Sequence, residues 1–309
     1  MIGWLKRLNV YFKEMYPIIP RLGLGFIIAL EIYFIVLLNQ GVTSFSLGLQ
    51  ECILGFTVFS FLCWLRIADD FKDYELDCRL FSHRPLPSGR VTKKDLRIFA
   101  TILISVTLLL NFIFMPKLHF LFCAILYSYG SLMAVWFFQK HKIQKSLPMA
   151  LVTHNPVQMI MNIYIISFTI IKYNLEIFTL HNIMALFTLY FPALIWEVSR
   201  KIRAPKDETE YVTYSKLFGY KKAVNFVFIV TWMDIITNFI LVWNLSKISV
   251  LALLINVLWM SWVFMDYKKD PERYKLVDKV ERYTFIQEGM MLLTVAVYLL
   301  SIAYNFILI

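Results

Sequence analysis

Four aspartates crowd into one short segment of an otherwise apolar chain. They follow a long apolar stretch directly and are Asp69, Asp70, Asp73 and Asp77. On a helix, spacings of three and four residues would put all four carboxylates on one face, where like charges repel unless a cation neutralises them. Hard oxygen ligands in this pattern suit Mg²⁺, which commonly shares its coordination shell with substrate phosphates. A solvated acidic turn at a helix end is the alternative interpretation of this first acidic segment (residues 69–77).

A second acidic segment mixes acids with bases. Residues 197–211 read Glu-Val-Ser-Arg-Lys-Ile-Arg-Ala-Pro-Lys-Asp-Glu-Thr-Glu-Tyr and also follow an apolar stretch. Its acids are suited to metal and its bases to phosphate oxygens. A diphosphate with bound Mg²⁺ needs both kinds of group, so the two segments together favour a diphosphate site. Because Glu197 lies one helical turn before Arg200 and Lys201, part of this segment could instead be a salt-bridged helix end.

The composition of the 309-residue chain indicates a membrane protein. Hydrophobic residues make up 59% of it and charged residues only 17%, which is unusual for a soluble domain. Segments long enough to cross about 30 Å of hydrocarbon can be drawn at 18–38, 44–65, 96–115, 118–138, 148–171, 178–196, 223–243, 247–265 and 285–307. We therefore predict an all-α polytopic protein with about nine transmembrane helices, in which residues 1–309 form a single transmembrane domain.

The Lys and Arg residues predict its orientation. With the N-terminus inside the cell, the 31 Lys and Arg residues all fall in inside segments except Lys117, Lys172 and Lys247. The loops 66–97 and 197–222, which carry the acidic segments, then share the cytoplasmic face. The net charge of +10 reflects this topology and contact with anionic lipid. No nucleic-acid partner is expected, because the bases are spread over separate loops.

At these residues the chain resembles a known family. The first acidic segment resembles the aspartate-rich motif of the UbiA superfamily of intramembrane prenyltransferases, which usually begins with Asn. Residues 84–89, Arg-Pro-Leu-Pro-Ser-Gly, resemble the stretch after that motif in many members. Residues 153–158, Thr-His-Asn-Pro-Val-Gln, are similar to the family's Thr-x-x-Pro-Gln segment with one extra residue. The predicted span count and the inside placement of both loops agree with the family.

The second acidic segment departs from the family pattern. Where members commonly have two Asp four residues apart, this chain has Glu197 and Lys201. Asp207 and Glu208 lie roughly where ubiquinone-pathway members keep an Asp pair. Because a Lys cannot bind Mg²⁺, we hypothesise that the Lys201 ammonium contacts the diphosphate directly and replaces one metal contact.

The resemblance implies a Mg²⁺-dependent enzyme built as a UbiA-like helical bundle with a central cavity. It would ionise an allylic (poly)prenyl diphosphate and transfer the prenyl group to a small acceptor, such as an aromatic compound or quinone precursor. The expected setting is the cytoplasmic membrane of a bacterium, with the active site on the cytoplasmic side. The implied metal ligands are Asp69, Asp70, Asp73, Asp77, Glu197, Asp207 and Glu208, and the implied diphosphate-binding cations are Lys72, Arg200, Lys201 and Arg203.

The carbocation formed by ionisation needs a dry pocket lined by aromatic rings, whose faces attract positive charge without reacting. An interfacial aromatic belt is the alternative explanation for aromatics at span ends. The candidate residues are Tyr127, Tyr129, Trp136, Tyr190, Trp196 and Tyr211.

Polar residues inside the predicted spans are candidates for acceptor chemistry. His154 and Asn155 could orient the acceptor, with His154 removing its proton, or they could bond the carbonyls freed by Pro156. A carboxylate within a span must pair or line the cavity, which applies to Glu51, Asp234 and Glu288. Asp234 is the predicted proton-handling residue. Glu31 is interpreted as an outside-facing end of the first span.

Three other functions remain to be weighed. A UbiA-type terpene cyclase would perform the same ionisation and then cyclise the cation without an acceptor. A CDP-alcohol phosphotransferase requires Asp-Gly and Ala-Arg before its final aspartates, and neither pair precedes Asp73 and Asp77. A non-enzymatic transporter typically places charged groups and broken helices at mid-membrane, whereas most charges here lie in loops on one face.

Overall fold

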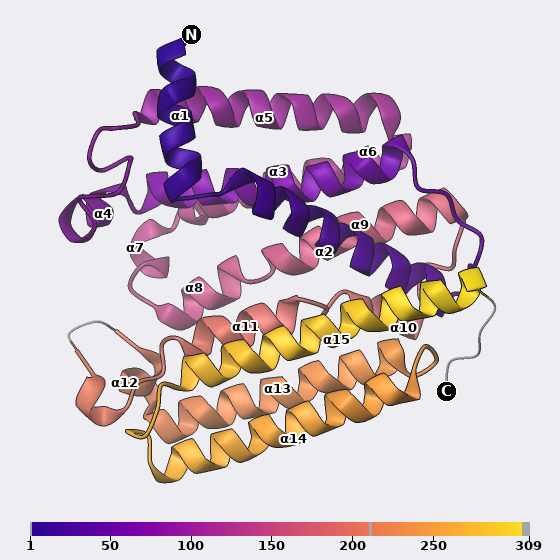
Figure 1. The fold of residues 1–309 in the computed structure, drawn as a ribbon. Helices are drawn as coiled ribbons and strands as arrows, with labels where there is room; N and C mark the ends of the chain where they lie inside the picture. Colours follow the sequence, from indigo (N-terminus) through magenta and orange to yellow (C-terminus); the bar gives the residue numbers. More distant parts are fainter. Residues whose placement is uncertain (1, 210–211, 305–309) are drawn as a thin grey trace. The chain divides into compact units, whose positions relative to one another are not determined.

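The computed structural model describes residues 2–209 and 212–304, and the regular structure in these residues is entirely helical. The helices group into two compact units (Figure 1). Unit 1 contains residues up to 30 together with 45–140 and 171–173, and unit 2 contains 31–44, 141–170 and the described residues from 174 onward. The predicted all-α fold class is confirmed.

Unit 1 is built on three long helices that pack on one another (Figure 1): α3 (Leu49–Lys72), α5 (Lys93–Phe114) and α6 (Lys117–Ala134). Its other elements are α1 (Ile2–Glu14), the first part of α2 (Ile18–Asn39), α4 (Tyr74–Leu80) and the 3₁₀ turn η1 (Trp136–Phe138). A capping box starts α5, since the Thr92 hydroxyl accepts the Asp95 N–H (3.1 Å) and the Asp95 carboxylate accepts the Thr92 N–H (3.0 Å). Arg7 of α1 pairs with the same Asp95 carboxylate at 2.7 Å, which fastens α1 to α5.

A buried polar seam joins the three long helices of unit 1. The Ser60 hydroxyl lies 2.7 Å from that of Thr107 and 2.9 Å from that of Tyr127, so α3, α5 and α6 meet at one point. One turn further along α5, the Asn111 amide donates to the Thr57 hydroxyl at 2.9 Å. Side-chain hydrogen bonds of this kind hold helices together where lipid offers no hydrophobic driving force between them.

Unit 2 packs α11 (Tyr190–Ser199) and α13 (Tyr220–Val242) with α14 (Lys247–Lys269) and α15 (Leu276–Tyr304) (Figure 1). It also contains the rest of α2, α7 (Lys140–Ile143), α8 (Leu147–His154), most of α9 (Val157–Tyr173), α10 (Leu180–Ala185), η2 (Pro205–Asp207) and α12 (Tyr214–Phe218).

Eight segments of the described chain are long and apolar enough to cross a bilayer, one fewer than the number drawn from the sequence. The difference lies at 148–171, which forms two shorter helices, α8 and α9, separated by a turn at Asn155 and Pro156. Proline has no N–H to donate to the preceding turn, and its ring clashes with the carbonyl four residues earlier, so the helix breaks there.

Close helix approach in unit 1 depends on a glycine. A Cβ on Gly25 of α2 would lie 2.7 Å from the backbone nitrogen of Phe59 in α3, whereas a Cβ on Gly23 would meet nothing within 4 Å. Small residues at such positions let membrane helices pack closely.

We expect Gly25→Ala to lower the thermal stability of the detergent-solubilised protein, because overpacking costs about 1–3 kcal/mol. The matched change Gly23→Ala on the same helix should leave the melting temperature unchanged or raise it, because Ala favours helix over Gly by about 1 kcal/mol. Equal melting temperatures for the two variants would contradict the close α2–α3 contact.

Candidate active site

The first acidic segment spans the end of α3 and the start of α4. The helix on which we expected all four aspartates is interrupted at Asp73, whose φ of −97° and ψ of 7° separate the two helices. Backbone hydrogen bonds of 2.9 Å still run from the Asp73 N–H to the Asp69 carbonyl and from the Asp77 N–H to the Asp73 carbonyl. The four-residue spacing therefore survives the break, and the charges of Asp69 and Asp77 both act on Asp73.

Two of the four carboxylates are buried and compensated by other side chains of unit 1. Asp70 accepts hydrogen bonds from the Tyr11 hydroxyl at 2.5 Å and from Arg66 at 2.7 Å. Asp77 pairs with Arg84 at 2.9 Å. Hydrogen bonds to ionised groups are roughly twice as strong as neutral ones, so these partners fix Asp70 and Asp77 in place.

The other two carboxylates lie at the junction itself. The Asp69 side chain is 47% exposed and pairs with Lys72 at 3.3 Å, and the Lys72 ammonium lies 4.4 Å from the ring centroid of Trp136. Asp73 is exposed. Partial loss of hydration nevertheless raises the pKa of its carboxyl; the positive charge of Lys72 opposes this rise, and the negative charges of Asp69 and Asp77 add to it. An added cation would therefore relieve repulsion at Asp69 and Asp73.

These residues fit a metal that a substrate helps to bind. The described residues contain no group of three or more acidic, His or Cys side chains close enough to enclose a metal by themselves. Mg²⁺ is typically held by one or two carboxylates together with substrate phosphates and water. The hard oxygen donors around Asp73 match that mode of binding, and the metal-ligand assignments stay predictions.

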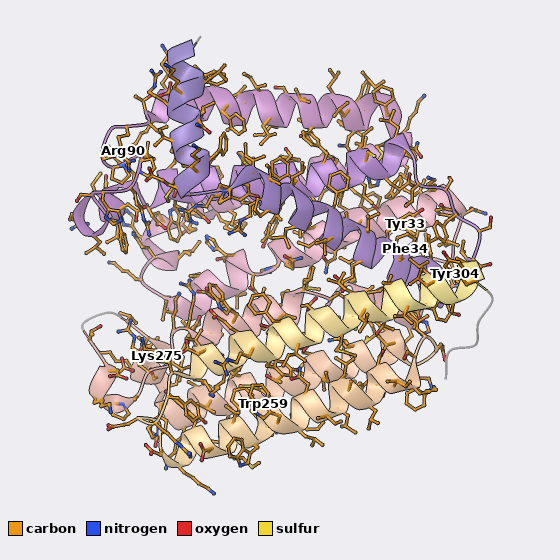
Figure 2. All side chains as sticks on the ribbon, viewed as in Figure 1. Tyr33, Phe34, Arg90, Trp259, Lys275 and Tyr304 are labelled. Atoms are coloured by element: carbon orange, nitrogen blue, oxygen red, sulfur yellow. The ribbon has the colours of Figure 1, made fainter. Side chains whose placement is uncertain are left out.

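Helix α1 holds the first acidic segment from outside it. Arg90, in the loop between α4 and α5 (Figure 2), donates to the Glu14 carboxylate at 2.8 Å and to the His83 carbonyl at 2.6 Å. Tyr11 of the same helix binds Asp70. The sequence interpretation missed this role of α1. The available signal was the apolar spacing of Leu8, Tyr11 and Phe12, which marks a buried helix face.

The second acidic segment lies in unit 2, at the end of α11 and beyond. Glu197 pairs with Arg200 at 2.6 Å and with Lys201 at 2.8 Å, so a salt-bridged helix end is present. Glu208 accepts hydrogen bonds from the hydroxyls of Thr213, at 2.7 Å, and Ser215. Glu197 and Glu208, both predicted metal ligands, are therefore bonded to side chains of the protein itself.

A cavity of about 410 Å³ in unit 2 brings several bases together. Arg200 and Arg203 of the second acidic segment line it, with exposed Asp207 beside them. Lys275 and Tyr274, from the segment before α15, line the same cavity and were not singled out from the sequence. Three cations around one cavity form an arrangement that can bind phosphate oxygens.

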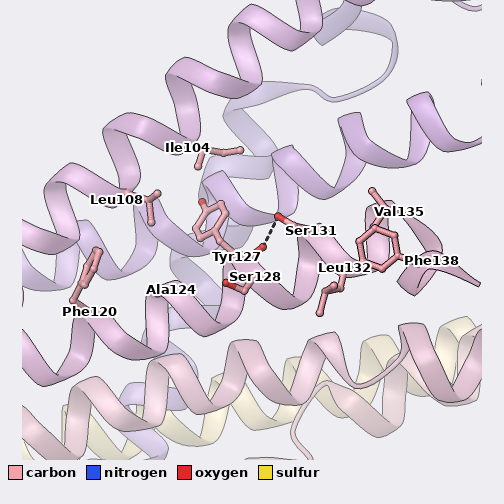
Figure 3. Close-up of a pocket in the computed structure, with 10 residues that line it drawn as sticks. All are labelled: Ile104, Leu108, Phe120, Ala124, Tyr127, Ser128, Ser131, Leu132, Val135 and Phe138. Atoms are coloured by element: carbon pink, nitrogen blue, oxygen red, sulfur yellow. Dashed lines mark hydrogen bonds between the residues drawn. The ribbon is translucent and has the colours of Figure 1, made fainter.

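A groove of about 700 Å³ follows α6 where that helix faces α5 (Figure 3). Its lining is mainly apolar, with Ile104 and Leu108 of α5 and Ala124 and Tyr127 of α6, and it also includes the hydroxyl-bearing Ser128 and Ser131. Tyr127, a predicted substrate-binding residue, exposes part of its ring there, while its hydroxyl is bonded to Ser60. A lining of this kind suits a hydrocarbon chain.

The groove ends at an unusual turn beside the first acidic segment. Trp136, Phe137 and Phe138 of η1 have φ values of 55°, 49° and 58°, a left-handed conformation that costs about 1–2 kcal/mol per residue for L-amino acids. Lys72 lies over the Trp136 ring, and Tyr129 packs on Phe137 with ring centroids 5.4 Å apart. Because Phe138 lines the groove, the apolar groove and the Asp69–Lys72 pair adjoin each other within unit 1.

Comparison with known proteins identifies the family. A family model described as the UbiA prenyltransferase family matches residues 29–289. The chain belongs to the UbiA prenyltransferase family. A search of curated proteins finds no match. A solved structure concerning digeranylgeranylglyceryl phosphate synthase in membranes covers 96% of this chain and 99% of its own, with 16% identity and a TM-score of 0.61. At that identity the likeness shows a common fold.

Membership of the UbiA family confirms the resemblance drawn from the acidic segments, and together with the apolar helices it makes the chain an integral membrane prenyltransferase. The matched range contains both acidic segments, and it begins after α1. The hydrogen bond from Tyr11 to Asp70 thus ties a helix outside the matched range to the first acidic segment.

The remaining predicted residues lie mostly in unit 2. His154 Nδ1 is 2.9 Å from the Thr153 hydroxyl and 3.1 Å from the Ala150 carbonyl, both on its own helix. The Asn155 amide nitrogen is buried and makes no hydrogen bond to the described residues. Tyr190 packs against Phe187 and Phe191, Trp196 donates to Glu281 at 3.0 Å, and Tyr211 lies outside the described residues.

The acids within the spans divide into paired and unpaired groups. In unit 1, Glu51 pairs with Lys172 and accepts the Gly48 N–H at 2.9 Å. In unit 2, Asp234 is fully buried. Glu31 is only 3% exposed, so the interpretation of Glu31 as an outside-facing end of the first span was wrong. Carboxylate oxygens of Glu31, Asp234 and Glu288 are buried without a hydrogen bond to the described residues. Each such atom costs about 1–3 kcal/mol if nothing satisfies it.

We expect Tyr11→Phe to destabilise the protein by about 1.5–3 kcal/mol, the usual worth of a hydrogen bond to a charged group. The measurement is thermal unfolding in detergent, and the control is Tyr304→Phe at a residue that is 75% exposed (Figure 2). Equal stability of Tyr11→Phe and wild type would show that α1 does not anchor the first acidic segment.

Proposed function

We propose that this UbiA-family protein is a Mg²⁺-dependent prenyltransferase that breaks the carbon–oxygen bond of an allylic isoprenoid diphosphate and transfers the prenyl group to a small acceptor. The supporting observation is the junction of α3 and α4, where Asp69 and Asp73 lie beside Lys72 with Asp77 close by. The proposed setting is the cytoplasmic membrane of a bacterium, with both acidic segments on the cytoplasmic face as the Lys and Arg distribution predicts.

The first acidic segment would hold the leaving group. Asp69, Asp73 and Asp77 are the proposed principal ligands of the metal, and Asp70, bonded to Tyr11 and Arg66, would set their position. When bound, Mg²⁺ supplies Lewis-acid stabilisation of the negative charge that builds on the departing diphosphate. Lys72 would contact the phosphate oxygens next to them as a fixed positive charge.

We propose that the second acidic segment also binds phosphate oxygens. Arg200 and Arg203 line a cavity with Lys275, which supports direct contact with phosphate oxygens. Lys201 is paired with Glu197. It would move from that carboxylate to the diphosphate, or Lys201 and Glu197 would bind the metal-bound diphosphate together. Glu197, Asp207 and Glu208 are the proposed further metal ligands from this segment.

Acceptor activation is assigned to unit 2. We propose that Asp234 takes the proton that the acceptor loses when its new bond to the prenyl carbon forms. His154 is the second candidate base, and Asn155, whose amide nitrogen is buried without a bond to the described residues, would orient the acceptor. The aromatic rings of Tyr127, Tyr129 and Tyr190 are proposed to face the allylic cation.

A terpene cyclase is the second candidate function. It is favoured by the Glu197–Lys201 pair, which stands where members of the family commonly carry two Asp. The two functions separate when purified protein is incubated with geranyl, farnesyl and geranylgeranyl diphosphates and Mg²⁺. Hydrocarbon or terpene alcohol formed without an acceptor identifies a cyclase, whereas turnover only on addition of an acceptor identifies a transferase.

We expect Asp73→Asn to lower the rate of isoprenoid diphosphate consumption by about 10²-fold or more, a typical effect of removing one electrostatic stabiliser of a transition state. Asp278→Asn, at an exposed acid of α15, is the matched control and should retain the wild-type rate. Unchanged turnover in Asp73→Asn would refute the assignment of the first acidic segment.

We further expect the groove between α5 and α6 to hold the isoprenoid tail. Ala124→Trp should weaken binding of geranylgeranyl thiodiphosphate, an unreactive analogue, at least tenfold and spare geranyl thiodiphosphate, because each buried CH₂ contributes about 0.8 kcal/mol. Ile125→Trp is the control, since Ile125 is 45% exposed and lies outside the groove lining. Equal effects of Ala124→Trp on both analogues would place the tail elsewhere.

A further inference from the structure

Three helices of unit 2 carry a carboxyl group midway along their apolar length. Glu31 lies in α2, Asp234 in α13 and Glu288 in α15. Glu288 is near enough to Glu31 and Asp234 for the charges of both to act on it. None of the described Lys, Arg or His side chains acts electrostatically on the three carboxyls. They therefore form one uncompensated acidic cluster within the membrane span.

The acidic cluster has two polar companions that are wholly buried. The Tyr283 hydroxyl and both amide atoms of Gln287 make no hydrogen bond to the described residues, although both side chains are 0% exposed. Both lie close to Asp234 without reaching hydrogen-bond geometry, whereas Asn238 donates to the other oxygen of that carboxyl at 3.2 Å. Two buried polar side chains of α15 thus lie close to Asp234, and these polar atoms make no hydrogen bond to the described residues.

The unpaired polar atoms of the acidic cluster determine which kinds of ligand can bind to it. A directly chelated metal is not indicated, because the three carboxyls are neighbours but are not close enough together to hold one metal ion among the described residues. Unpaired oxygens of Glu31, Asp234, Glu288 and Gln287 call for a ligand that donates hydrogen bonds. An anion placed there would be buried in a medium of low dielectric without a neighbouring Lys, Arg or His to compensate its charge, which is costly.

We propose that this cluster binds the polar head of the acceptor, and that it accepts an uncharged or cationic head bearing hydroxyl or amine hydrogens and rejects an anionic one. The inference rests on the proposed prenyl transfer, because it assigns a chemical class to the acceptor of that reaction. Tyr283 and Gln287 donate to the oxygen atoms of such a head, and the carboxyls accept its hydrogens.

Matched pairs of probes test the proposal in wild-type protein already loaded with geranylgeranyl thiodiphosphate. One pair is 4-hydroxybenzyl alcohol and 4-hydroxybenzoate, the other is glycerol and glycerol phosphate, and 4-hydroxybenzylamine is the cationic probe. Binding is measured by calorimetry. The uncharged or cationic member of at least one series should bind at least tenfold more tightly than its anionic counterpart. Equal or tighter binding of both anions, or binding of none of the probes, overturns the proposal.

Variants attribute the discrimination to the cluster. Glu288→Gln and Glu31→Gln should each weaken binding of the cationic probe at least threefold, because each removes a carboxyl that can ionise to pair with it, and Tyr283→Phe should weaken the uncharged probe while leaving the anion unchanged. Glu176→Gln, at an exposed acid of unit 2, should keep the wild-type preference. An unaltered preference in all three cluster variants overturns the proposal.

Different results would contradict the proposed prenyl transfer and the proposed acceptor class. Wild-type protein that does not bind geranylgeranyl thiodiphosphate contradicts the proposed function itself. Protein that binds this analogue and favours an anionic probe contradicts only the acceptor class. Binding of the analogue by each variant also shows that the variant is folded, so a lost preference is not mistaken for lost structure.

Discussion

The structure depends on one constraint: a hydrocarbon environment offers no hydrogen-bonding partner, so polar groups within the spans must be satisfied by the protein. Long helices meet this demand for the backbone. In unit 1 several side chains meet it as well, through the seam of Ser60, Thr107 and Tyr127 and through the pairing of Glu51 with Lys172. Two places where the demand is not met, or is met with difficulty, are the junction of α3 and α4 and the acidic cluster of unit 2, and it is there that we propose the chemistry occurs.

The junction of α3 and α4 shows how the protein tolerates four neighbouring acids. Arg66, Arg84 and Lys72 each pair with a carboxylate, and Tyr11 adds a hydroxyl. Partial loss of hydration and the charges of Asp69 and Asp77 still raise the pKa of Asp73, so the compensation is incomplete at the centre. Such a site is organised before any ligand arrives, and a metal-bound diphosphate would supply the missing positive charge together with oxygens for Lys72. Preorganised charges of this kind cost little rearrangement when the reaction occurs.

The second acidic segment uses its charges differently. Glu197 is bonded to two cations and Glu208 to two hydroxyls, whereas Arg200 and Arg203 also face a cavity together with Lys275. This segment is therefore richer in phosphate-binding groups than in open carboxylates. This composition agrees with the presence of Lys201 at a position where family members commonly have an acid. It also favours direct contact between these cations and phosphate oxygens.

The sequence by itself determined the features that depend on local composition: the helical class, the succession of apolar spans, the first acidic segment and the family. These signals are strong because a span is a long continuous run and an acid cluster is contiguous. Only the tertiary structure decided which distant residues meet. Asp70 binds Tyr11 fifty-nine positions away, Lys72 lies over Trp136, and Glu31 is buried in unit 2. Such contacts depend on which faces of separate helices pack together, and the hydrophobic pattern of a membrane helix, apolar on nearly every side, does not specify that face.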